Sequence, residues 1–428
     1  MSSRQIITSE RLGESFTKIE HSSGLTLMLC PMKGFSTAYA LFATKYGSVD
    51  TCFKTDKDAD FAQVPEGIAH FLEHKLFESE DGDAFSRYAQ TGASANAYTS
   101  FDRTAYLFSC TENFKESIEI LLDFVTHPYF TPATVQKEQG IIGQEIKMYD
   151  DSADWRVFFN LLGALYHNHP VRIDIAGTVE SISHIDADLL YRCYHTFYNL
   201  NNMVLSIAGN FDVGTVLEAA DRILKKAEPI RIERKSPPEP AGVVKSFVEQ
   251  RLPVAVPIFQ MGFKYESLSA SENMRQQVLG EMALDVVAGE NTPLYRRLYD
   301  AGLINATFSA ETMVGADYIL GMFSGESKDP QRVYDEICAE IRRIQQEGID
   351  DSLFEQCKKS TYGRYVGLLG RVESVATWMM MSHFSGVEMY ELTEIVANVT
   401  REKLEDYLRQ RINTQHSALS VVRSPEAS

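Results

Sequence analysis

The spacing of apolar residues predicts both helices and strands along the chain. Apolar residues recur every three or four positions, as on the buried face of a helix, in the segments 114–125, 132–149, 187–198 and 330–347. Apolar, β-strand-like runs occur at 25–30, 37–46, 246–250 and 258–265. Strands and helices do not alternate strictly, which favours an α+β fold over a doubly wound sheet.

A proline-rich segment predicts a domain boundary. Pro237, Pro238 and Pro240 lie within residues 228–242, and proline removes backbone donors and favours extended conformations. We therefore expect a linker at 228–242 between a first domain at 1–227 and a second at 243–428.

Sequence echoes indicate that the two domains are copies of one unit. Each half opens with two predicted strands, and Lys45-Tyr46 at the end of one is matched by Lys264-Tyr265 in the other. Asn96-Ala97 is echoed later by Asn305-Ala306. The shared order of these echoes predicts a duplicated α+β unit.

Composition narrows the class of protein. The chain has 428 residues, 44% of them hydrophobic, and 41 Lys and Arg against 59 Asp and Glu give a net charge of −18. Such a chain can build sizeable cores, and its acidity argues against binding nucleic acid or an anionic membrane. We expect no membrane-spanning helix, because no apolar run reaches about 18 residues.

The N-terminus and the cysteines predict a cytoplasmic location. No apolar stretch of signal-peptide length opens the chain. The six cysteines are scattered and form no Cys-x-x-Cys pair, a pattern expected of reduced, buried thiols and not of a disulfide scaffold or a thiolate zinc site.

The segment 65–78 is the strongest candidate for chemistry. It contains His70, Glu73 and His74 among apolar residues that predict a buried helix. At about 100° per residue, the two histidines lie one turn apart on one face, so their nitrogens can converge on one metal ion. Glu73 shares that face without needing to be a ligand. This is the His-x-x-Glu-His pattern of the inverzincins.

A catalytic zinc site commonly takes three protein ligands, so a third must come from elsewhere. Glu138 and Glu145 lie seven residues apart on a predicted helix and therefore point the same way. One can bind the metal while the other orients a ligand or the base. A single histidine on an apolar helix is usually structural, but burying an ionised Glu73 without a partner would cost several kcal/mol.

At these residues the sequence resembles the pitrilysin/insulinase family of zinc peptidases, over nearly the whole chain, and within it a bacterial, two-domain, processing-peptidase-like group (YmfH-like). The resemblance implies two homologous domains, each a mostly antiparallel sheet packed with helices, as in LuxS/MPP-like metallopeptidases. It implies one Zn²⁺ per chain, bound by His70, His74 and Glu145. Glu73 would then be the general base, and Glu138 would support a ligand.

The family resemblance also implies a peptide-binding strand. Asn96, Ala97 and Tyr98 match the edge strand to which relatives add the substrate backbone, a mode that uses the unpaired N–H and C=O groups of a sheet edge. Without the resemblance, an inner strand is the simpler interpretation of these residues.

The second half points to a partner chain. It has no His-x-x-Glu-His at the corresponding helix, and Tyr299 and Asn305 stand where related enzymes usually carry an Arg and a Tyr. In two-chain relatives, a zinc-free subunit often supplies that pair. We therefore expect the zinc subunit of a heterodimer, with a homodimer as the alternative.

The expected function is a zinc-dependent endopeptidase that cleaves unfolded peptides held in a chamber. The alternative is a partner-dependent protein that binds or matures one dedicated peptide and has little general peptidase activity.

Overall fold

The structure, a computed structural model, describes residues 3–80 and 82–425 and divides into two units. The described parts of the first unit are 3–80, 82–146, 174–236 and 367–384, and those of the second are 147–173, 237–366 and 385–425. Neither unit is continuous in sequence. The linker led us to expect the continuous ranges 1–227 and 243–428. The units differ from these ranges because residues 147–173 belong to the second unit and residues 367–384 to the first.

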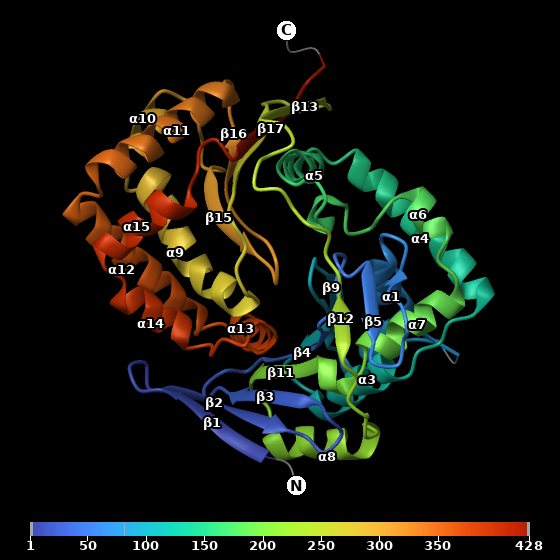
Figure 1. The fold of residues 1–428 in the computed structure, drawn as a ribbon. Helices are drawn as coiled ribbons and strands as arrows, with labels where there is room; N and C mark the ends of the chain where they lie inside the picture. The colour runs from blue at the N-terminus through green and yellow to red at the C-terminus, as the bar shows by residue number, and fades with distance from the viewer. Residues whose placement is uncertain (1–2, 81, 426–428) are drawn as a thin grey trace. The chain divides into compact units, whose positions relative to one another are not determined.

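The first unit is built on a seven-stranded sheet with the order β1-β2-β3-β11-β4-β10-β9 (Figure 1). In chain order its strands are β1 (Ser3–Ser9), β2 (Glu14–Glu20), β3 (Thr26–Pro31), β4 (Ala38–Thr44), β9 (Ser94–Thr99), β10 (Thr104–Cys110) and β11 (Met203–Gly209). All neighbouring strands in it are antiparallel except β3 and β11. The smaller sheets are β12 (Ile232–Arg234) with β5 (Cys52–Thr55) and β6 (Ala62–Gln63), and β7 (Glu78–Ser79) with β8 (Gly82–Asp83).

Helices of the first unit pack on and beside this sheet. They are α1 (Ile68–Leu76), α2 (Ala84–Thr91), α3 (Phe114–Thr126), α4 (Pro132–Asp150), α6 (Val179–Ser183), α7 (Ala187–Phe197), α8 (Val213–Ile223) and α13 (Val372–Ser385). Helix α1 contacts β9 and β10, and α3 contacts β4 and β10. The site described below lies between α1, α4 and the edge strand β9.

The second unit repeats this plan with five strands in the order β13-β17-β14-β16-β15. They are β13 (Phe247–Arg251), β14 (Ile258–Lys264), β15 (Ser309–Val314), β16 (Ile319–Glu326) and β17 (Ser417–Arg423). Its helices are α5 (Ala153–Leu165), α9 (Ala270–Ala288), α10 (Pro293–Asp300), α11 (Pro330–Glu347), α12 (Asp351–Leu368), α14 (Glu391–Asn398) and α15 (Arg401–Arg411). In the described part of this second sheet, β13 and β17 pair in parallel and the other neighbouring strands are antiparallel.

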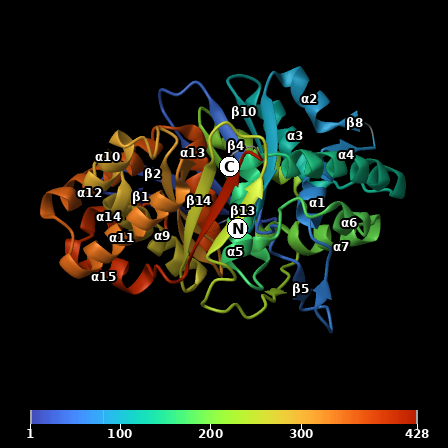
Figure 2. The ribbon, with the colours of Figure 1, turned by 90° about the horizontal axis from the view of Figure 1, so that it is seen from above.

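Each unit carries a helix from the other half of the chain. Helix α5 packs on β13, β14 and β17 of the second unit (Figure 2). Helix α13 belongs to the first unit, where Ser206 Oγ of β11 donates to the Ala376 carbonyl oxygen of α13 at 2.7 Å. The attachment is equivalent in both: Lys45 Nζ donates to the Phe384 carbonyl oxygen at 2.6 Å, and Lys264 Nζ donates to the Leu165 carbonyl oxygen at 3.1 Å. The matched Lys-Tyr echoes therefore mark the points where the exchanged helices are attached.

The structure confirms the α+β class with two homologous, mostly antiparallel domains, and the predicted helices and strands are present within a few residues of their expected bounds. The prediction that Asn305-Ala306 repeats the strand position of Asn96-Ala97 is wrong. Asn96 lies within β9, but Asn305 precedes β15 in a loop, because four-residue similarity does not determine register.

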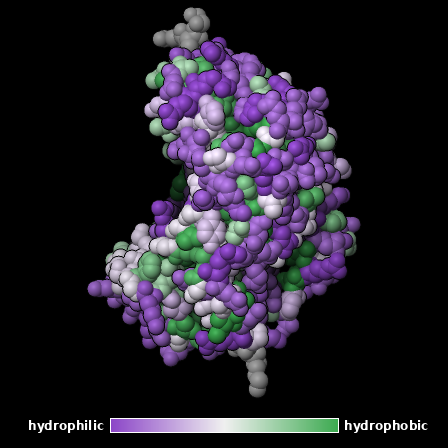
Figure 3. Space-filling view, turned by 90° about the vertical axis from the view of Figure 1, so that its left-hand side faces the viewer, coloured by the Kyte–Doolittle hydropathy of each residue, from purple (hydrophilic) through white to green (hydrophobic). Residues whose placement is uncertain are grey.

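The distribution of side chains between surface and interior is that of a globular protein with a polar surface. On the face in Figure 3 hydrophilic side chains predominate, with apolar ones scattered between them. The six cysteines are free, and five of them are buried. Across residues 3–80 and 82–425, no helix combines the length and apolar character needed to cross a membrane.

Candidate metal centre

Helix α1 holds the His-x-x-Glu-His residues in a buried setting. It begins after Gly67, whose φ of 87° is left-handed, and a Cβ there would meet the Ala176 carbonyl oxygen at 2.4 Å. Glycine is therefore required at this helix start. The helix buries Ile68, Ala69, Phe71, Leu72 and Leu76. These buried apolar side chains fix the rotation of the helix and therefore the direction in which His70 and His74 point.

Both histidines reach one carboxylate on α4. His70 Nε2 lies 3.8 Å from Glu145 Oε1, and His74 Nε2 lies 3.3 Å from Glu145 Oε2. One donor atom from each of the three residues lies within 4.8 Å of the others. Two imidazole nitrogens and one carboxylate oxygen form a donor set of catalytic zinc sites, with zinc about 2.0–2.2 Å from each donor. The chemistry and spacing of this set therefore fit a zinc ion.

A second carboxylate on α4 orients one of the histidines. Glu138 Oε1 lies 3.0 Å from His74 Nδ1, and Glu138 is buried. A hydrogen bond at Nδ1 fixes the ring and leaves Nε2 to face a metal. His70 differs, since its buried Nδ1 has no hydrogen-bond partner among the described residues.

The two imidazoles have opposite electrostatic environments. Burial, followed by the charge of His74, lowers the pKa of His70 to about 4, so its ring is neutral and ready to act as a ligand. Burial also lowers the pKa of His74, but hydrogen bonds to Glu138 and Glu145 outweigh it and raise that pKa to about 10. In the metal-free chain a proton on His74 therefore compensates the carboxylates, and metal binding would release it.

Glu73 lies beside the donor set without belonging to it. Burial raises the pKa of its carboxyl group, an effect partly offset by His74 and by hydrogen bonds from Thr99. Thr99 Oγ1 donates to Glu73 Oε2 at 3.0 Å. A partly buried carboxylate with a raised pKa suits proton transfer near neutral pH.

The edge strand β9 runs past this site. Among the strands of the described residues, β9 pairs only with β10. Ser100 N–H donates to the Arg103 carbonyl oxygen at the end of that ladder. Because hydrogen-bonded pairs alternate along antiparallel strands, the backbone groups of Ala95 and Ala97 point to the open edge. The Asn96 side chain accepts a hydrogen bond from the Ala97 N–H at 2.9 Å. Of the three predicted peptide-binding residues, Ala97 thus offers backbone groups and Asn96 caps one of them.

Comparisons with known proteins agree with this architecture. The family model for insulinase, peptidase family M16, matches residues 62–179, and the M16 inactive-domain model matches residues 184–361. The uncharacterized zinc protease YmfH of Bacillus subtilis is 38% identical over 408 residues, covering 94% of this chain and 95% of that protein. The chain belongs to peptidase family M16. The predicted family and the YmfH-like group within it are confirmed.

Two further relatives extend the M16 comparison. A solved structure from Alicyclobacillus acidocaldarius, described as M16-like, has a TM-score of 0.89 and 34% identity and covers 99% of both chains. A Schizosaccharomyces pombe protein named as mitochondrial-processing peptidase subunit beta is 29% identical over 187 residues, 42% of this chain and 41% of that protein. The similarity to the solved M16-like structure therefore extends over 99% of this chain.

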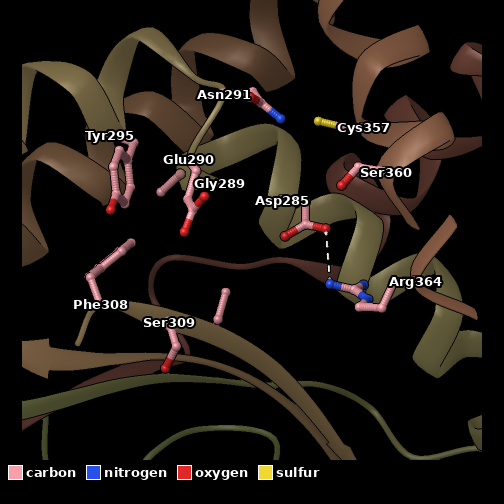
Figure 4. A pocket seen from close by; sticks show the side chains of 12 residues that line it. Asp285, Gly289, Glu290, Asn291, Tyr295, Phe308, Ser309, Cys357, Ser360 and Arg364 are labelled. Atoms are coloured by element: carbon pink, nitrogen blue, oxygen red, sulfur yellow. Dashed lines mark ion pairs between the residues drawn. The ribbon is translucent and has the colours of Figure 1, made fainter. Parts of the chain in front are cut away.

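The second unit has an ion pair where the first has the candidate ligands. In its element order, α9 and α12 correspond to α1 and α4. Glu281 and Asp285 on α9 have the spacing of His70 and His74. Arg364 Nη2 on α12 lies 3.1 Å from Glu281 Oε2. Its Nη1 lies 3.6 Å from Asp285 Oδ2, the ion pair that Figure 4 marks with a dashed line. A guanidinium therefore supplies the positive charge that the first unit's donor set would take from a metal.

The two departures in the second half have separate surroundings. Tyr299 lies on α10 and is 51% exposed. Asn305 lies before β15 and donates from Nδ2 to Glu326 Oε2 at 2.7 Å. Their effect on substrate binding stays a prediction.

Thr99 is the contact that sequence reasoning missed. It follows the predicted residues 96–98 directly, but only the packing of α1 against β9 brings its hydroxyl to Glu73. The sequence feature that could have indicated this contact is the hydroxyl of Thr99, a β-branched residue at the end of the Asn-Ala-Tyr-Thr run.

Proposed function

We propose that this M16 protein is a zinc-dependent endopeptidase acting on unfolded peptides. The observation that carries the proposal is the convergence of His70, His74 and Glu145, with Glu73 beside them and outside the donor set. The naming of relatives as zinc proteases supports it.

In this proposal, His70, His74 and Glu145 hold one zinc ion, and Glu138 keeps the His74 ring aimed at it. A bound zinc would supply Lewis acidity toward the scissile carbonyl and lower the pKa of a water molecule. Glu73 takes the proton from the attacking water and later delivers it to the leaving amine. Its raised pKa favours both transfers.

Peptide binding would use the open edge of β9. The backbone groups at Ala95 and Ala97 can pair with an extended peptide, which then becomes one more strand beside the metal site. Asn96 must release the Ala97 N–H for that pairing, so its amide becomes available to the peptide. Such recognition reads the backbone first, as a peptidase for unfolded chains requires.

We further propose that the chain is the zinc subunit of a cytoplasmic two-chain enzyme that encloses its substrate in a chamber. The absence of an Arg and a Tyr at positions 299 and 305 favours a zinc-free partner that carries them. A relative named as a subunit is consistent with this arrangement. The second candidate, a partner-dependent protein for one dedicated peptide, rests on the same two positions.

A quenched-fluorescent peptide library tests these proposals. The isolated chain, its chelator-treated form and the zinc-restored form should be compared, each with and without a homologous zinc-free subunit. We expect the chelator to abolish peptide cleavage and added zinc to restore it. Adding the zinc-free subunit should increase the cleavage rate strongly. No cleavage of any peptide in the presence of both partner and zinc would contradict a general peptidase and favour the dedicated-peptide candidate.

A further inference from the structure

The carboxylate of Glu73 is held by the residue that ends the edge strand. Thr99 is the last residue of β9, and its Oγ1 donates to Glu73 Oε2 at 3.0 Å. The backbone of Thr99 hydrogen-bonds to the same carboxylate. Thr99 therefore contacts the candidate base both through its side chain and through its main chain.

The Thr99 hydroxyl is itself supported by the core. Thr104, opposite Thr99 on β10, places its Oγ1 3.5 Å from Thr99 Oγ1 and donates to the Tyr46 carbonyl oxygen at 2.9 Å. Thr104 and Tyr46 are fully buried. The position of the Thr99 side chain is thus set by rigid elements of the sheet and not by solvent-exposed groups.

The contact restricts the orientation of the Glu73 carboxylate. Of its two oxygens, Oε2 accepts the hydrogen bond from the Thr99 hydroxyl. A glutamate side chain freed from such a contact samples several rotamers, and a base acts efficiently only within hydrogen-bond reach of the proton it takes. Holding Oε2 therefore restricts where Oε1 points.

We propose that Thr99 is a positioning residue for the general base. Its hydroxyl fixes the Glu73 carboxylate in the orientation that proton transfer needs. This inference rests on the proposed peptidase function. Because Thr99 belongs to the strand that a peptide would extend, the same residue also ties the register of the bound peptide to the location of the base.

Substitutions at Thr99 separate positioning from structure. Thr99→Val keeps the β-branched shape that suits a strand but removes the hydroxyl. Loss of one hydrogen bond to a charged group predicts a fall in kcat of roughly ten- to a hundredfold, with KM and bound zinc unchanged. Thr99→Ser restores the hydroxyl and should recover most of kcat. Thr8→Val, the same change on the exposed strand β1 at the opposite edge of the sheet, is the matched control and should behave as wild type.

A double-mutant comparison gives a readout that a merely structural role would not produce. In a Glu73→Ala background, Thr99→Val should reduce the residual rate no further, because the carboxylate it positions is gone. A purely structural role would lower the residual rate by the same factor as in the wild type.

The outcomes distinguish this inference from the function on which it rests. If Glu73→Gln cleaves peptides as fast as the wild type, the proposed function fails. If Glu73→Gln abolishes cleavage but Thr99→Val retains the wild-type kcat, or Thr99→Ser does not recover it, the positioning role alone is overturned.

Discussion

Replacing Glu138 should weaken metal binding while leaving the three donors in place. Glu138 Oε1 lies 3.0 Å from His74 Nδ1 and is buried, so it both orients the ring and favours electron donation from Nε2. Partners of this kind typically contribute ten- to a hundredfold in metal affinity, or about 1.4–2.8 kcal/mol. Glu138→Gln keeps an acceptor oxygen but loses the charge, so we expect about a tenfold loss of zinc affinity. Glu138→Ala loses both, and about a hundredfold loss is expected.

Zinc competition against a chromophoric chelator of known affinity measures this effect. Glu116→Gln, the same change on the exposed surface of α3, controls for loss of one negative charge. If both Glu138 variants bind zinc as tightly as the wild type, or if Glu116→Gln weakens it equally, the orienting role of Glu138 is refuted.

The Arg364 ion pair, the partly buried His383 and the exchanged helices can each be tested by stability or assembly. Arg364→Met leaves the partly buried Glu281 and Asp285 without their cation, so the free energy of unfolding should fall by roughly 1–3 kcal/mol. Thermal unfolding measures this loss, and an unchanged Tm would contradict a stabilising role of the ion pair. His383 has its pKa lowered to about 4 by burial and by Lys18 and Lys45. The unfolded chain, with a histidine pKa near 6.5, therefore binds the proton first as the pH falls, and stability should drop between pH 6.5 and 4 by up to about 3 kcal/mol. His383→Gln should flatten that decline in denaturant titrations, and an equally steep profile would refute the assignment. Separate fragments 1–236 and 237–428 each lack the exchanged helix that covers their sheet, so we expect aggregation alone and co-purification when they are co-expressed. Two monomeric fragments with sharp unfolding transitions would argue against a structural need for the exchange.

Local patterns were sufficient to predict the shared faces of the site. The four-residue spacing of His70 and His74 and the seven-residue spacing of Glu138 and Glu145 place each pair on one helix face. Which carboxylate approaches Nε2 and which approaches Nδ1 depends on how α1 and α4 pack. Residue spacing left that choice open, the family resemblance suggested Glu145 as the ligand, and the packing places Glu145 at Nε2.

Non-local packing explains what the sequence could not predict. The apolar pattern of α5 predicts a buried face but does not say which sheet that face covers. Its packing on the sheet beyond the linker therefore could not be predicted from the sequence. Hydrogen bonds such as that from Lys264 to Leu165 join residues 99 positions apart. The contact from Thr99 to Glu73 likewise arises only when β9 lies against α1.

Substituting Glu73 by glutamine tests whether this carboxylate is the general base of a zinc peptidase. Gln keeps the size of the side chain and removes its basicity, while His70, His74 and Glu145 remain in place to bind metal. We expect one zinc per chain by metal analysis and a loss of peptide hydrolysis of roughly 10²–10⁴-fold, the usual contribution of a general base. Hydrolysis at the wild-type rate by a zinc-loaded Glu73→Gln chain would contradict the role of Glu73 as the general base.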